Sequence, residues 1–220
     1  NEHEEGSAIA QSIKKLLKAG HEPTEIAVLY RSRVVKQPIE EALITAGVPY
    51  VVVGDSGFFQ KREVRDLLSL VRFAVQPDSN LDALRVVDAV KIGVSAKKLE
   101  DTWEATETSV RQQLEVLARK GGTTGPRAAT LLAQVDALAK ALRSATSDFG
   151  TAQGEVIFQA WQQVLLAPLE KYVCSESKDG DEKLIKKEVE RRTENVRFLL
   201  NDIERRFADG ASIEDIVDDI

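Results

Sequence analysis

The chain has 220 residues, of which 43% are hydrophobic and 30% charged, and it carries a formal net charge of −6 at pH 7. This acidic balance argues against nucleic-acid binding by the whole surface, but it leaves room for a local basic patch. The single cysteine, Cys174, excludes an internal disulfide, and no apolar run approaches the length of a membrane span. The two histidines lack partners at zinc spacing, so no metal site is expected.

Helices and short apolar runs alternate over the first part of the chain. Residues 4–20 have the apolar spacing of a helix, which Gly20 would end. Residues 25–31 and 49–53 are apolar runs of strand length, and a helix that begins near Pro38 separates them. This order predicts a right-handed βαβ unit, with strands buried on both faces as in a parallel sheet. The fold class we expect is therefore an α/β start.

Strand signals nearly vanish after residue 80, and the remainder is expected to be mostly α-helical. An amphipathic helix follows the Phe58-Phe59 pair, and further helices are predicted at 81–90, 96–119, 127–143, 155–166 and 183–208. The predicted loops are GGTTGP at 121–126, residues 144–154 and SESKDGDEK at 175–183. The change from α/β to helical character lies between Pro77 and Ser95.

The polar cluster at the end of the first predicted strand is the leading candidate site. Tyr30, Arg31, Ser32 and Arg33 follow the apolar run directly, at the strand end where open α/β sheets place their ligands. An aromatic ring beside a guanidinium could stack on a base and hold a phosphate. The alternative is a buried strand whose end reaches water, with both arginines simply solvated.

Two basic clusters are candidate DNA-binding residues. One lies on the first turn of the helix after the Phe pair, and the other flanks the turn KIGVS at 91–95; the residues are Lys61, Arg62, Lys91, Gly93, Lys97 and Lys98. A glycine turn that opens onto a helix N-terminus presents backbone N–H groups that suit a phosphate. The alternative is that these lysines are ordinary surface charges.

The motifs of a complete enzyme are missing. The sequence has no GxxxxGK[ST] phosphate loop, and no Ser/His/Asp or Cys/His set is apparent. It also begins with Asn and contains no Met. We therefore expect an excised piece of a longer protein that is not catalytic alone.

Three segments resemble the motif IV region of superfamily 1 DNA helicases of the UvrD/Rep/PcrA type. They are IAVLYRSR, PIEEALITAGVPYVVVG and GFFQKREVRDLLSLVRFAV, and RTENVRFL at 192–199 is similar to an R-x-E-N-L-x-x-L segment of the helical 2B subdomain. The resemblance implies a partial RecA-like 2A segment with a parallel sheet at 1–90 and a 2B-like subdomain at 91–220. A hinge would lie near 76–80 or 91–95.

The resemblance also implies roles for particular residues. Tyr30 would pack on adenine, and Arg31 would reach the γ-phosphate of ATP and act in catalysis. ATP with Mg²⁺ would bind the complete protein, with none bound to this segment alone. Lys91 and Gly93 stand where the family contacts duplex DNA, although KIGVS keeps only Ile92-Gly93 of the usual turn.

The same resemblance implies a biological setting. The complete protein would unwind DNA at a junction of single strand and duplex, together with the remaining helicase domains and with a protein partner on the helical subdomain. It would be cytoplasmic, nucleoid-associated in a bacterium, and would not bind membranes. The alternative reading is a helicase-like regulatory or protein-interaction module without ATPase activity.

Overall fold

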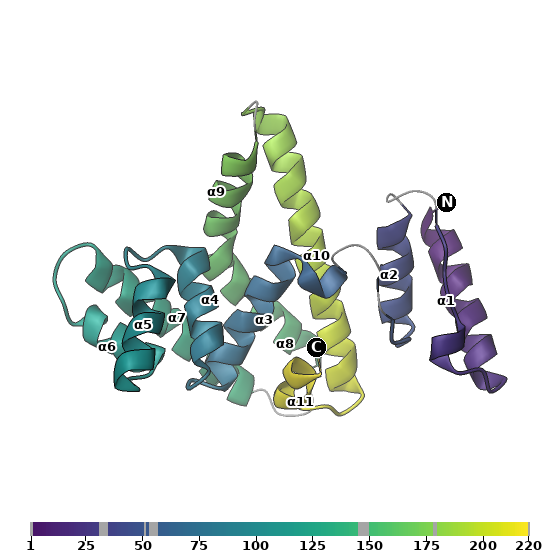
Figure 1. The fold of residues 1–220 in the computed structure, drawn as a ribbon, viewed down its shortest axis with the longest axis horizontal. Coiled ribbons are helices and arrows are strands. Elements are labelled where there is room, and N and C mark those ends of the chain that lie inside the picture. The colour runs from purple at the N-terminus through teal and green to yellow at the C-terminus, as the bar shows by residue number, and fades with distance from the viewer. Residues whose placement is uncertain are drawn as a thin grey trace. The chain divides into compact units, whose positions relative to one another are not determined.

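The computed structural model describes residues 2–30, 35–50, 52, 57–144, 150–177 and 180–219. It contains two compact units, Asn1–Lys61 and Arg62–Ile220. Figure 1 shows the helices of both units in chain order. The boundary at residue 90 was expected from the resemblance to the 2A and 2B subdomains, and that assignment stays a prediction.

The described part of the first unit contains two helices and two short 3-10 turns. Helix α1 is Glu2–Lys18 and α2 is Lys36–Thr45, while the 3-10 turns are Pro23–Glu25 and Phe58–Gln60. Apolar side chains of both helices and of the segment after α2 form its core: Ala10, Ile13, Ile39, Leu43 and Val48. The two helices predicted from apolar spacing, at 4–20 and after Pro38, are therefore confirmed.

The predicted sheet of this unit is wrong: the described residues form no strand. Residue Ile26 is extended, with φ −107° and ψ 124°, but the apolar run alternates in burial. Ile26 and Val28 pack on the α1–α2 core, whereas the side chain of Leu29 is 94% exposed. The helices cover only one face of the segment, and a strand buried on both faces needs a second layer and paired neighbours. Residues 31, 51 and 53 of the two predicted strands lie outside the described residues.

A buried carboxylate holds the end of the first unit together. Glu40 on α2 is 3% exposed, and its Oε1 accepts hydrogen bonds from the backbone N–H of Phe58 (3.0 Å) and from the hydroxyl of Tyr50 (3.3 Å). Burial, and then the Glu40 charge, raises the pKa of Tyr50. Phe58 is 1% exposed, so its ring is buried in the core.

Helix α3 (Arg62–Val75) is the centre of the second unit. It contacts α4, α7, α8, α10 and α11. Seven of its apolar side chains are buried: Val64, Leu67, Leu68, Leu70, Val71, Phe73 and Ala74. A helix that buries this much of its circumference must be surrounded by other elements, and the rest of the unit is arranged around it.

Four helices follow α3 on one side of the unit. They are α4 (Asn80–Val90), α5 (Ala96–Thr106), α6 (Val110–Ala118) and α7 (Thr124–Ser144). The single helix predicted at 96–119 is divided, because Glu107 takes a left-handed conformation and Ser109 caps the start of α6. Ser109 and Gln112 form a capping box, which satisfies the backbone donors at the start of α6.

The C-terminal half continues as α8 (Gly150–Trp161), a π turn (Gln162–Leu166), α9 (Ala167–Glu176), α10 (Glu182–Ala208) and α11 (Ile213–Asp218). The π turn precedes Pro168, whose missing N–H and bulky ring oppose a regular α-helix at this point. Figure 1 shows α9 and the first half of α10 projecting together as an arm. The expectation of a helical remainder is confirmed.

Candidate functional site

A hollow of about 650 Å³ in the second unit gathers basic side chains. We call it the basic groove. It is lined by the cations Arg62, Lys91, Arg127 and Lys171, by polar side chains of Thr130, Gln134, Gln163, Tyr172 and Ser175, and by an apolar floor that includes Val90, Ile92, Leu131 and Val164. None of the described residues that line it is acidic. In a chain of net charge −6, such a cluster is a candidate anion site. Two of its cations also pair with carboxylates outside the lining, Arg62 with Asp66 and Lys91 with Asp88.

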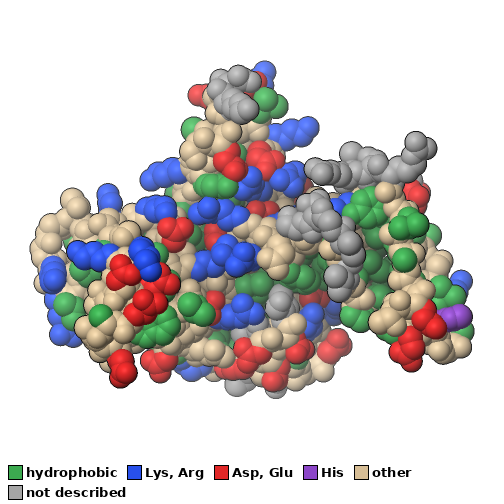
Figure 2. All heavy atoms as spheres, viewed as in Figure 1, with side chains coloured by type: hydrophobic (Ala, Val, Ile, Leu, Met, Phe, Trp, Pro, Cys, Tyr) green, Lys and Arg blue, Asp and Glu red, His purple; other side chains and the backbone are tan. Residues whose placement is uncertain are grey.

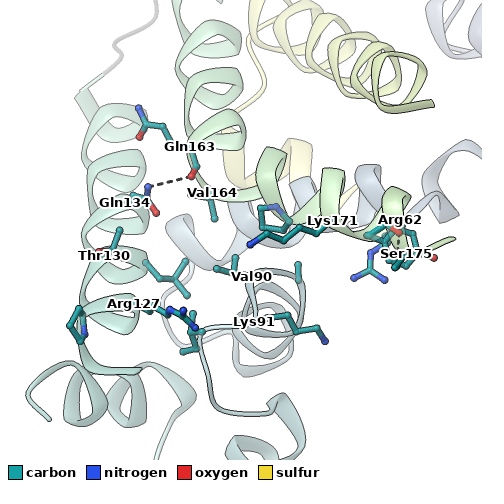
Figure 3. A pocket seen from close by; sticks show the side chains of 16 residues that line it. Arg62, Val90, Lys91, Arg127, Thr130, Gln134, Gln163, Val164, Lys171 and Ser175 are labelled. Atoms are coloured by element: carbon teal, nitrogen blue, oxygen red, sulfur yellow. Dashed lines mark hydrogen bonds between the residues drawn. The ribbon is translucent and has the colours of Figure 1, made fainter. Parts of the chain in front are cut away.

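Four separate elements supply the four cations. Arg62 is the first residue of α3, Lys91 follows the last residue of α4, Arg127 lies in the first turn of α7, and Lys171 lies on α9. Figure 3 shows Arg127 and Lys171 extending into the hollow from their two helices. The convergence is therefore a product of the tertiary fold, because no two of these residues are neighbours in sequence.

The turn after α4 forms one end of the groove. Lys91 has φ 55° and Gly93 has φ +104°, both in the left-handed region. A Cβ atom on Gly93 would lie 2.9 Å from Oγ1 of Thr124 and 4.0 Å from Nη1 of Arg127. The glycine is therefore required both by its backbone angle and by the close approach of the start of α7. Ile92, between them, is 1% exposed and anchors the turn.

Arg62 forms the other end of the groove. Its Nε lies 3.4 Å from Oδ2 of Asp66, and Nε of Arg85 lies 2.8 Å from Oδ1 of the same carboxylate. Burial raises the pKa of Asp66, and the two arginines oppose that rise. The guanidinium carbon of Arg62 lies 4.0 Å from the ring centre of Tyr172. A hydrogen bond joins α7 to the π turn: the side-chain amide of Gln134 donates to the carbonyl oxygen of Gln163 at 3.5 Å.

Of the predicted DNA-binding residues, the structure places Arg62 and Lys91 in the groove and Gly93 against Arg127. The other three lie elsewhere. Lys61 belongs to the first unit, where its Nζ is 5.1 Å from the ring centre of Phe58.

Lys97 and Lys98 lie on the exposed first turn of α5. Nζ of Lys97 lies 2.9 Å from Asp101 and 3.1 Å from Glu100, and these partners raise the pKa of Lys97. The backbone N–H of Lys98 donates to Oγ of Ser95. Lys97 is thus neutralised on its own helix.

Of the predicted nucleotide site, Tyr30 lies within the described residues. Tyr30 is the last described residue before positions 31–34, and it is 39% exposed. Arg31, the predicted catalytic residue, lies outside the described residues, as does Arg33. Their roles stay predictions.

Sequence reasoning missed Arg127, Lys171 and Tyr172. Arg127 directly follows the GGTTGP loop, which was recognised only as a loop. Lys171 and Tyr172 sit in a helix of mixed polarity, and no local pattern distinguishes them from solvated residues. Figure 2 shows that Lys and Arg side chains gather where α3, α4 and α9 meet, and that acidic ones gather over α11.

The segment RTENVRFL joins α10 to the start of α3. The side-chain amide of Asn195 donates to Oε1 of Glu63 at 2.6 Å, across 132 residues of sequence. Asn195 is 1% exposed and Glu63 is 4% exposed. Arg192, also on α10, donates hydrogen bonds to Glu176 of α9 and to Glu188 of α10. The RTENVRFL segment therefore helps to hold α3, the helix that carries Arg62, in place.

Two further findings concern the described part of the chain. No group of three or more His, Cys, Asp and Glu side chains there could hold a metal ion. No helix there is both long and apolar enough to cross a bilayer.

Comparison with known proteins identifies the family. A model described as UvrD-like helicase C-terminal domain matches residues 1–204. The chain is 37% identical over 101 residues to the ATP-dependent DNA helicase PcrA of Bacillus subtilis, which is 46% of this chain and 14% of that protein. It is 33% identical over 123 residues to the ATP-dependent DNA helicase UvrD1 of Mycobacterium leprae, 54% of this chain and 16% of that protein.

A third relative is the ATP-dependent DNA helicase UvrD2 of Mycobacterium tuberculosis, 33% identical over 112 residues, 48% of this chain and 16% of that protein. The chain thus spans 14% to 16% of the length of these curated relatives. The resemblance to UvrD- and PcrA-type helicases is confirmed at the level of the family, while the assignment of 2A and 2B stays a prediction. Because the family model covers most of the sequence, the chain belongs to the UvrD-like helicase C-terminal domain family.

Proposed function

We propose that this chain is part of an ATP-dependent DNA helicase and that its basic groove holds the phosphate backbone of DNA near the junction of duplex and single strand. The observation that supports the groove's role is the convergence of four cations, without a lining carboxylate, in an otherwise acidic chain. Arginine and lysine contacts to phosphate position DNA without reading its sequence. Such a contact suits a motor that must work on any sequence.

The proposal is tested by the salt dependence of binding. The 220-residue chain is titrated against a fluorescein-labelled duplex with a single-stranded tail at several salt concentrations. Each phosphate contact removed should reduce the slope of log K against log salt by about 0.9. We expect Arg127→Ala and Lys171→Ala each to weaken binding and to reduce the slope in this way, equally for unrelated DNA sequences.

The chain offers a matched control in Lys97→Ala. Lys97 is also an exposed lysine, but it lies outside the groove and pairs with Asp101 and Glu100. We expect this variant to bind as the parent does. Equal losses from Lys97→Ala and from the two groove variants would mean that net charge, and not the groove, binds the DNA.

The nucleotide side of the proposal involves Tyr30 and Arg31. Tyr30 would pack on adenine, and Arg31 would neutralise charge on the γ-phosphate of ATP bound with Mg²⁺. The partial exposure of Tyr30 supports an accessible ring. In the complete helicase, Arg31→Ala should sharply reduce ATP hydrolysis and leave folding intact; hydrolysis at the parent rate would contradict the assignment.

The subdomain reading belongs to the same proposal. Residues 1–90 would form the first segment of 2A and residues 91–220 the 2B subdomain, with a hinge near 76–80 or 91–95. ATP binding and hydrolysis would close and reopen the two RecA-like domains around single-stranded DNA. In the structure, α3 and α4, which fall within residues 1–90, pack in one core with the helices that follow residue 91.

An alternative function is a helicase-like protein-interaction module without ATPase activity. A second hollow of about 840 Å³ between α9 and α10 favours it, because its lining includes the partly buried apolar side chains Leu166, Ile185 and Val189. Grooves between helices of this kind accept amphipathic helices. Salt-dependent DNA binding that is lost in Arg127→Glu would argue against this alternative.

A further inference from the structure

The ring of Tyr172 lies against the guanidinium of Arg62 in the basic groove. The guanidinium carbon of Arg62 is 4.0 Å from the ring centre, which is well within the range of a cation–π contact. Arg62 belongs to α3 and Tyr172 to α9, so the contact joins two helices across the end of the groove. Both residues line the groove.

Tyr172 is itself held in place from its hydroxyl end. The hydroxyl donates to Oε1 of Glu176 at 2.6 Å, and Oε2 of Glu176 accepts from Nη2 of Arg192 at 3.0 Å. Nε of Arg192 also donates to Glu188 at 2.7 Å. The ring therefore has a fixed orientation although Tyr172 is only partly buried. Its hydroxyl is held by Glu176 on the same helix, and Glu176 in turn is held by Arg192 on α10.

Asp66 fixes the other side of Arg62 without neutralising it. The Asp66 side chain is 11% exposed and pairs with both Arg62 and Arg85. One carboxylate thus serves two guanidinium groups, which leaves a net charge of +1 for the three residues. A stacked guanidinium that keeps its charge can direct its planar fork of N–H groups at two oxygens of one phosphate.

We infer that Tyr172 is a positioning residue that holds Arg62 in the orientation needed to bind a DNA phosphate in the groove. The inference rests on the proposed function of the groove. Tyr172, on the projecting α9–α10 arm, would therefore set the geometry of the phosphate contact. No feature of the sequence connects Tyr172 with the start of α3.

The first experiment is a double-mutant cycle on DNA binding by the 220-residue chain. A cation–π contact at an exposed site corresponds to about a two- to five-fold change in affinity. We expect Tyr172→Leu to weaken binding of the tailed duplex by about that factor, and Tyr172→Phe, which keeps the ring, to recover most of it. In the Arg62→Ala background, Tyr172→Leu should have no further effect.

The second experiment observes Arg62 directly and needs no DNA. The side-chain Nε–H resonance of Arg62, assigned in ¹⁵N NMR spectra with the Arg62→Ala variant, should carry a ring-current shift. We expect Tyr172→Leu to remove this shift and Tyr172→Phe to retain it. Unchanged far-UV circular dichroism of each variant shows that the helices persist.

The outcomes separate the inference from the function on which it rests. Absence of salt-dependent binding by the parent chain overturns the proposed function. Binding by the parent that Arg62→Ala weakens but Tyr172→Leu does not overturns the positioning role alone. The same holds if Tyr172→Leu weakens binding equally with and without Arg62, since the ring would then contact DNA by itself, or if the Arg62 resonance does not respond to Tyr172→Leu.

Discussion

The buried pair of Asn195 and Glu63 gives the sharpest prediction for stability. The amide of Asn195 donates to the Glu63 carboxylate at 2.6 Å, and both side chains are almost inaccessible, at 1% and 4% exposure. Substitution of Asn195 by Ala removes this donor from a buried acceptor on α3. Because α3 is the centre of the second unit, the loss should appear in global unfolding.

The size of the effect follows from two opposing contributions. A hydrogen bond to a charged group contributes about 1.5–3 kcal/mol, and an acceptor left buried without a donor loses that contribution. Alanine in place of asparagine regains about 0.6 kcal/mol through helix propensity. We therefore expect Asn195→Ala to lower the free energy of unfolding by about 1–2.5 kcal/mol. Asn195→Asp should cost more at neutral pH, because it places a second carboxylate beside Glu63.

Urea unfolding of the 220-residue chain, followed by circular dichroism, measures this change as a lower midpoint with an unchanged slope. Thr193→Ala is the matched control: Thr193 lies on the same helix, and its hydroxyl bonds only the carbonyl of Val189 in the preceding turn. The control should stay within about 0.5 kcal/mol of the parent. A midpoint for Asn195→Ala equal to that of the control would refute the reasoning.

Three further predictions concern other positions. Gly93→Ala should destabilise the chain by about 1–2 kcal/mol in thermal or urea unfolding, because its φ is +104° and the new Cβ would approach Thr124. Ser109→Ala should cost about 1 kcal/mol in urea unfolding through loss of the cap of α6. Hydrogen bonds from two arginines of α10 hold the pKa of Glu188 at about 2, below the 4.5 of an unperturbed glutamate, so its stabilising effect is present above pH 4.5 and lost as the pH falls toward 2. The midpoint of urea unfolding should therefore fall less steeply with acid in Glu188→Gln than in the parent.

The helical elements were predictable because their signals are local. Apolar spacing, Gly20 and Gly210 at helix ends and the long pattern of 183–208 all describe single helices, and α10 spans Glu182–Ala208. The division at Glu107 was missed although Ser109 and Gln112 carry a capping signature, because the apolar spacing continues across it.

The sheet and the groove were not predictable, for different reasons. An apolar run such as 25–31 indicates burial, but a strand also needs paired neighbours, and Leu29 is left 94% exposed. The groove depends on which helices meet: Arg127 and Tyr172 acquire their roles only when the first turn of α7 and the face of α9 reach the same hollow. Local charge patterns found Arg62 and Lys91 but gave equal weight to Lys97, which lies outside the groove.

The π turn at Gln162–Leu166 sets the rotational register of everything that follows it on α9. A π turn contains one residue more than the α-helical turn it replaces, and one residue rotates a helix by about 100°. If the same residues were wound as a regular α-helix, Tyr172 and Lys171 would therefore lie about a quarter of the way around the axis, away from Arg62. The orientation of two groove residues thus depends on an irregularity several residues upstream of them.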